Sequence, residues 1–116
     1  MQLNKESQKM NAEHYFHTAN QLKQDGKFEE AIDAYRQAIS IAPKVATYYQ
    51  ALGDSLAQID QLDEAIKCYR QAVNINPEGF QQYLTLGNVL IKKGLIGHEA
   101  ITNYYIVCGK HQVLKM

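Results

Sequence analysis

Histidine and cysteine are the residues of this chain with the most distinctive chemistry, because both ligate metals. His14 and His17 are three residues apart and would share one face of a helix. Cys108 and His111 have the same spacing. A structural zinc site needs about four ligands, and neither pair is accompanied by a second one. We therefore expect no metal or other cofactor, and we interpret these side chains as surface histidines and a packed cysteine.

Paired carboxylates are the other candidates for chemistry, as a general acid and base. Glu29-Glu30 and Asp63-Glu64 each open a predicted helix, where negative charge complements the positive end of the helix dipole. That placement explains both pairs without catalysis. The sequence also lacks a glycine-rich phosphate loop and a nucleophile elbow. We therefore predict that the protein is not an enzyme.

Composition and charge narrow the classes of partner. Twelve basic and twelve acidic side chains give a formal net charge of zero, so the basic field typical of nucleic-acid binding is missing. Lys92-Lys93 is the longest basic cluster, too short for polybasic docking to a membrane. No apolar run approaches the roughly 20 residues that span a bilayer, and the polar start of the chain lacks a secretory stretch. We expect a cytoplasmic protein that binds neither nucleic acid nor membrane.

The two cysteines fit that compartment. Cys68 and Cys108 are interpreted as small buried residues in a reducing environment. Two cysteines do not make a disulfide framework, and a disulfide between them stays open on the sequence alone.

The sequence repeats itself at a fixed period, and the repeated elements must position all these side chains. The segment FEEAIDAYRQAISIAP at 28–43 recurs as LDEAIKCYRQAVNINP at 62–77, an offset of 34 residues. The segment before each also recurs, and three copies with shared spacing indicate a tandem array. The positions that return are Tyr15, Ala19 and Leu22, then Tyr49, Gly53 and Leu56, then Tyr83, Gly87 and Leu90.

Each half of a copy is typical of an amphipathic helix. Tyr49, Leu52, Gly53 and Leu56 fall at i, i+3, i+4 and i+7, which is one helical stripe. Glycine inside a helix costs about 1 kcal/mol relative to alanine. Close approach of the paired helix would offset that cost at Gly53 and Gly87, so we predict that these glycines and Ala19 leave room for a tyrosine such as Tyr35 or Tyr69.

Turn residues separate the predicted helices at regular intervals. Gly26, Asp60 and Gly94 lie between paired helices, where a residue tolerant of the left-handed conformation is needed. Pro43 and Pro77 close the units, because proline disfavours helix at the residue before it.

The order aromatic, Leu-Gly, Ala, aromatic, Ala and closing Pro resembles the tetratricopeptide repeat (TPR) family over about residues 12–110. The first copy has Thr18-Ala19 in place of Leu-Gly, and the third has one extra residue around Gly97-His98, Val107 in place of a small residue, and no closing proline. The second copy carries the pattern as Tyr49, Leu52-Gly53, Ala65, Tyr69, Ala72 and Pro77.

The resemblance implies an all-α fold, a right-handed α-solenoid of about three tandem antiparallel helix pairs. The repeats would be 12–45, 46–79 and 80–110, the third irregular. A polar N-terminal segment, 1–11, would precede them, and a C-terminal tail, 111–116, would follow.

The resemblance also implies a protein–protein interaction scaffold that binds a peptide or protein segment in a concave groove lined by the first helix of each pair. The residues of each first helix that lie off the tyrosine stripe would face the groove. They form a polar set with apolar residues at Phe16 and Leu84. The alternative is that these are ordinary solvated residues and the groove is empty. The predicted partner-binding residues are Phe16, His17, Asn20, Gln50, Asp54, Gln81, Leu84, Asn88 and Lys92; Gln24 and Gln58 face the same way.

Some members of the family clamp the C-terminal carboxylate of heat-shock chaperones with two lysines, an arginine and two asparagines. The corresponding positions here hold Phe16, Asn20, Ala51, Gln81 and Thr85. Only Asn20 matches, and none supplies the cationic, charge-assisted donor that a carboxylate needs. We predict that the partner is not a heat-shock chaperone C-terminal tail.

The chain after Tyr105, IVCGKHQVLKM, is apolar and short, whereas the last repeat of an array usually needs a polar cap. Three explanations fit: a fragment of a longer array, pairing with a second copy through the C-terminal helix, or a tail folded back on the last pair. They leave two alternative functions, a self-association module and a targeting fragment of a larger TPR-containing enzyme.

Overall fold

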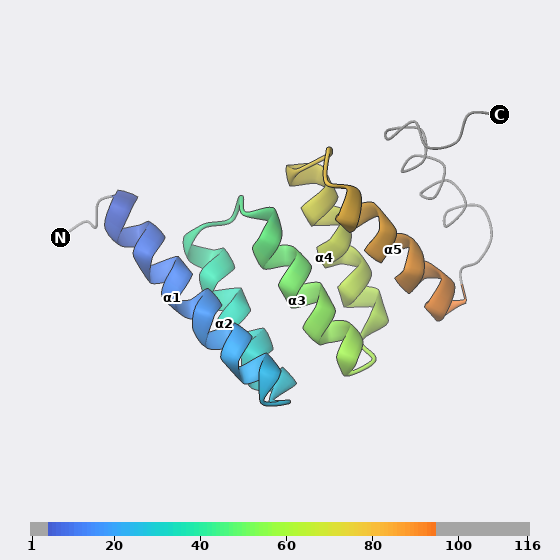
Figure 1. The fold of residues 1–116 in the computed structure, drawn as a ribbon, viewed down its shortest axis with the longest axis horizontal. Helices are drawn as coiled ribbons and strands as arrows, with labels where there is room; N and C mark the ends of the chain where they lie inside the picture. The colour runs from blue at the N-terminus through green and yellow to red at the C-terminus, as the bar shows by residue number, and fades with distance from the viewer. Residues whose placement is uncertain (1–4, 95–116) are drawn as a thin grey trace.

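The computed structural model describes residues 5–94, except for the side chains of residues 5, 6, 80 and 81. This part of the chain forms five α-helices and no strand, which confirms the predicted all-α, TPR-like fold. Figure 1 shows α1, α3 and α5 side by side in one layer, with α2 and α4 behind them, and each helix packs on the next along the chain. The helices are α1 (Lys5–Gln24), α2 (Phe28–Ile41), α3 (Ala46–Gln58), α4 (Leu62–Ile75) and α5 (Phe80–Lys93).

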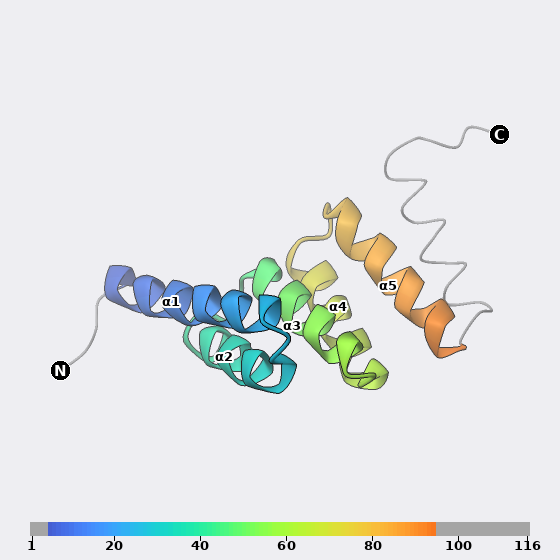
Figure 2. The same cartoon turned by 60° about the horizontal axis from the view of Figure 1, so that its bottom comes forward.

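Several predictions from the sequence fall outside the described residues. They concern the second helix of the third copy, the insertion at Gly97-His98, the tail 111–116 and self-association through the C-terminal helix. At the other end, α1 begins at Lys5 and therefore extends back into the segment that the sequence sets apart as a polar N-terminal stretch. In Figure 2 this extension continues the axis of α1 beyond the end of α2.

Left-handed residues end the first helix of each pair, as predicted. Gly26, Asp60 and Gly94 have φ angles of 81°, 65° and 95°. After α1 and α3 the chain closes with the hydrogen bonds of a Schellman motif. Lys27 N donates to Leu22 O at 2.9 Å, and Gln61 N donates to Leu56 O at 2.8 Å. The two turns thus have the same geometry although one uses glycine and the other aspartate.

The two described second helices, α2 and α4, end at Ile41 and Ile75, and one non-helical residue separates each from the following proline. Ala42 has φ −131° and ψ 86°, and Asn76 has φ −127° and ψ 80°, both outside the helical region. Proline disfavours the helical conformation at the preceding residue, so Pro43 and Pro77 set the end points of α2 and α4. Successive pairs therefore repeat the same path.

Buried tyrosines from the second helices form the centre of the core. Tyr35 of α2 is fully buried and Tyr69 of α4 is 1% exposed. A Cβ added at Gly53 would lie 2.6 Å from Cε1 of Tyr69. The predicted close approach is confirmed: the missing side chain of Gly53 is what lets the Tyr69 ring lie against α3.

The predicted tyrosine stripe is only partly correct. Tyr83 is buried, but Tyr49 is half-buried and Tyr15 is 37% exposed. Tyr48 is buried in place of Tyr49, in a small cluster with Ala12 and Ala38. Tyr49 lies in the first turn of α3, where it borders Pro43 and the end of α4 at Ile75, so its paired helix stops before covering it.

We predict that Gly53→Ala lowers the free energy of unfolding by about 1–3 kcal/mol, because overpacking against the Tyr69 ring outweighs the better helix propensity of alanine. Urea denaturation measures the change. In a Tyr69→Leu background the same substitution should become neutral or stabilising. A gain of about 1 kcal/mol in the wild-type background, as propensity alone would give, contradicts the packing.

We predict that Asp60→Gly raises the free energy of unfolding by about 0.5–1 kcal/mol, because glycine adopts positive φ without the clash of a Cβ. Asp60→Ala should lower it, because alanine keeps the Cβ and loses the local hydrogen bonding of aspartate. Both are read from thermal or urea unfolding. Equal effects of the two variants would count against a left-handed Asp60.

Candidate functional site

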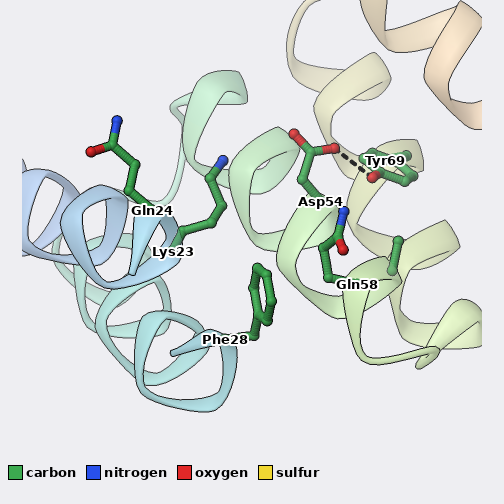
Figure 3. A pocket seen from close by; sticks show the side chains of 7 residues that line it. Lys23, Gln24, Phe28, Asp54, Gln58 and Tyr69 are labelled. Carbon is green, nitrogen blue, oxygen red and sulfur yellow. Dashed lines mark hydrogen bonds between the residues drawn. The ribbon is translucent and has the colours of Figure 1, made fainter. Parts of the chain in front are cut away.

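A cleft of about 560 Å³ opens between the last turns of α1 and α3. Figure 3 shows Lys23, Phe28, Asp54 and Gln58 around it, from α1, the start of α2 and α3, with Tyr69 of α4 beside Asp54 and the amide of Gln24 pointing away from Asp54. The lining combines one cation, one carboxylate, two side-chain amides and an aromatic ring. The residues are Lys23, Gln24, Phe28, Asp54, Ala57, Gln58 and Tyr69.

Hydrogen bonds from the buried tyrosines fix two of the predicted groove residues. The hydroxyl of Tyr35 donates to Oδ1 of Asn20 at 2.5 Å, and the hydroxyl of Tyr69 donates to Oδ1 of Asp54 at 2.6 Å. The two bonds are 34 residues apart in the sequence and join equivalent positions of successive repeats. Each joins a second helix to the first helix of its own pair, so Asn20 and Asp54 are oriented by the core.

Both tyrosines remain donors at neutral pH. Burial, together with the charge of Asp54, raises the pKa of Tyr35 to about 12. Burial raises the pKa of Tyr69 further, and the hydrogen bond to Asp54 and its charge act in the same direction. A phenolate beside a carboxylate would be both desolvated and repelled, so the neutral hydroxyl is the form that the fold holds.

Phe16 is less available to a partner than its position in the sequence predicts. Its half-buried ring lies 4.8 Å from the ring of Tyr48 and 5.8 Å from that of Tyr35, measured between centroids. The side chain packs against both core clusters. Phe16 therefore contributes mainly to the junction of α1, α2 and α3.

A second polar link joins the first helices of the second and third copies. Gln50 Nε2 donates to Thr85 Oγ1 at 3.1 Å. Oε1 of Gln50 is buried and has no hydrogen-bond partner among the described residues. Gln50 is thus half-buried between α3 and α5, and a partner would reach it only in part.

The remaining predicted residues lie elsewhere on the first-helix layer. His17 is exposed on α1, Gln81 lies in the first turn of α5, and half-buried Leu84 follows in the second turn. Asn88 and Lys92 are exposed on α5. Of the nine predicted partner-binding residues, the cleft contains only Asp54.

Three cleft residues were missed from the sequence. Lys23 and Ala57 are 34 residues apart and directly precede Gln24 and Gln58, so repeating the groove positions one residue earlier would have found them. Phe28 looks like an ordinary first residue of a helix, and nothing in the sequence shows that its ring faces a cleft.

Thiol and metal chemistry have no support in the described residues. Burial raises the pKa of the Cys68 thiol to about 11, with smaller opposing effects of Arg36 and Glu64, so the reactive thiolate is disfavoured. Within residues 5–94, no three histidine, cysteine, aspartate or glutamate side chains are placed to share a metal ion. In the same range no helix has the length and apolar character to cross a membrane.

The profile of the TPR repeat matches residues 19–60 and 53–94. The chain therefore belongs to the TPR repeat family. A search of curated proteins gave no match.

Solved TPR structures share the fold. The second TPR of Spaghetti (RPAP3), bound to the HSP90 peptide SRMEEVD, is similar with a TM-score of 0.79 and 23% identity over 88% of this chain and 95% of that chain. The first TPR of the same protein, bound to the same peptide, has a TM-score of 0.80 and 20% identity over 87% of this chain and 79% of that chain. MamA has a TM-score of 0.84 and 26% identity over 90% of this chain and 60% of that chain.

We predict that Tyr35 and Tyr69 make stability fall steeply at alkaline pH. Their raised pKa values mean that the folded state binds protons that the unfolded state releases above about pH 10. The contribution is therefore complete below pH 10 and lost as the pH rises toward 12, by up to about 1.4 kcal/mol per pH unit for each tyrosine. Urea unfolding at a series of pH values measures the slope.

The Tyr35→Phe variant supplies the comparison, because it removes one of the buried ionisable groups. Its slope above pH 10 should be shallower than that of the wild type, whatever its stability at neutral pH. Tyr15→Phe, at an exposed position, is the matched control and should keep the wild-type slope. An unchanged slope in Tyr35→Phe would contradict the assignment.

Proposed function

We propose that the protein is an interaction scaffold that binds a peptide or extended protein segment along its first-helix layer. The observation that carries this proposal is the cleft between α1 and α3, in a chain of a family built from tandem helix pairs. Its volume lies in the range of ligand-binding pockets, roughly 300–1,000 Å³, and its few convergent polar groups fit recognition of a peptide. A repeat array offers such a surface because each pair buries its stripe against its neighbours and leaves the groove open.

The cleft suits an extended segment better than a folded partner. Gln24 and Gln58 lie on either side of it, and a side-chain amide both donates to a backbone carbonyl and accepts from a backbone N–H. The apolar ring of Phe28 gives side chains of the segment a surface to cover. The cleft therefore meets both the polar backbone and the side chains of a peptide.

We further propose that a heat-shock chaperone C-terminal tail is not the ligand. The RPAP3 structures hold an HSP90 peptide, but the positions of this chain that correspond to the family's carboxylate clamp have other tasks. Phe16 packs on Tyr35 and Tyr48, Asn20 accepts the Tyr35 hydroxyl, and Ala51 is buried. A terminal carboxylate would find no cation among them.

We predict that Gln58→Trp with Asn88→Trp weakens partner binding, because two bulky rings on exposed positions of α3 and α5 obstruct the groove without entering the core. The measurement is quantitative affinity capture from native cells, with recovery expected to fall about tenfold, the effect of about 1.4 kcal/mol.

The matched control is Gln37→Trp with Lys67→Trp, two exposed positions on α2 and α4. It places the same rings on the other layer and should leave recovery unchanged. Circular dichroism confirms that both doubles stay folded. Equal recovery with the two doubles would locate binding away from the first-helix layer.

A further inference from the structure

We propose that the cleft between α1 and α3 receives a lysine side chain of the bound segment, with the Asp54 carboxylate as its counter-ion. The inference rests on the proposed function and names the chemistry of the partner at one position.

The fold does not require a negative charge at position 54. Tyr69 needs an oxygen acceptor there, and the equivalent Tyr35 finds one in the neutral amide of Asn20. Position 20 and position 54 occupy the same place in successive repeats. The carboxylate of Asp54 therefore adds a charge beyond what the tyrosine hydrogen bond uses.

The Asp54 carboxylate is held in one orientation. Oδ1 of Asp54 is held by the Tyr69 hydroxyl at 2.6 Å. Figure 3 shows the other carboxylate oxygen pointing away from Tyr69, toward the α1 side of the cleft. Among the described residues no ion pair joins Asp54 to a cation. The free oxygen is thus a fixed, charged acceptor at the cleft wall.

The groups that line the cleft match a lysine side chain. Its ammonium has three donors, and the cleft offers the free Asp54 oxygen together with the side-chain amide of Gln58, one turn further along α3. The hydrocarbon stem would lie along Phe28 and Ala57, which are apolar. Arginine fits less well, because its planar fork favours two carboxylate oxygens, and Tyr69 already engages one.

The cleft already has one cation, Lys23. Its Nζ lies 6.0 Å from the centroid of the Tyr35 ring, within reach of a cation–π interaction, and forms no ion pair with Asp54. A lysine from a partner would meet repulsion from Lys23. If the cleft instead received an acidic side chain, Lys23 would be the attractive group, so removing its charge separates the two cases by sign.

The probes are four immobilised pools of short random peptides, alike except for a fixed central Lys, Arg, Gln or Glu. The full chain and its variants are tested for binding to each pool at low and at physiological salt. Asp54→Asn removes the charge and keeps an acceptor for Tyr69, as Asn20 does for Tyr35. Asp33→Asn, an exposed carboxylate on α2, is the matched control for net charge.

We expect the Lys pool to bind about five- to tenfold more strongly than the Gln pool, a difference on the order of 1 kcal/mol, and the preference to weaken with salt. Asp54→Asn should remove the difference between the Lys and Gln pools. Lys23→Gln should strengthen binding to the Lys pool, and Asp33→Asn should change nothing.

Other results overturn the inference. A preference for the Glu pool that Lys23→Gln removes would assign an acidic ligand, and an Arg pool equal to the Lys pool would contradict the choice of lysine. Equal binding of all four pools, or a Lys preference that survives Asp54→Asn, would reject Asp54 as the counter-ion and leave the scaffold function standing. Absence of binding to every pool would reject both proposals for this cleft.

Discussion

The rest of the structure depends on one contact, the packing of a second-helix tyrosine against the first helix of its own pair. For Tyr69 the ring lies where a side chain on Gly53 would be, and the hydroxyl reaches Asp54. The ring closes the core and the hydroxyl ends at the groove. A single side chain therefore connects the stability of the pair with the position of a polar group in the cleft.

The period of the sequence predicts most of this arrangement, because each element is set by local chemistry that repeats. Left-handed turn residues at Gly26 and Asp60 and prolines at 43 and 77 determine where helices end, whatever the surroundings. The glycine opposite the tyrosine is predictable for the same reason: a residue that weakens a helix needs a packing partner that requires it. The helix pairs and their order follow from these constraints.

The cleft is less predictable, because the surface of an array depends on contacts between copies that are not identical. Phe16 lies off the tyrosine stripe and would be a groove residue in an isolated pair, but the neighbouring Tyr48 covers it. Tyr49 follows the pattern and yet is only half-buried, because α4 stops at Ile75 beside it. Helical periodicity assigns a face to each residue, whereas the extent of its burial depends on where the adjacent helix ends and how large its side chains are.

Comparison of Asn20 with Asp54 shows how a repeat changes its surface chemistry while the core contact is kept. Asn20 accepts a hydrogen bond from Tyr35 and Asp54 accepts one from the equivalent Tyr69, each through Oδ1, so exchanging amide for carboxylate leaves the contact in place. What changes is the second terminal atom, an N–H donor in asparagine and a charged acceptor in aspartate. Charge in the groove is thus free to vary while the tyrosine contact is kept. In an array whose copies share one backbone, this freedom is what allows neighbouring repeats to present different chemistry on one surface.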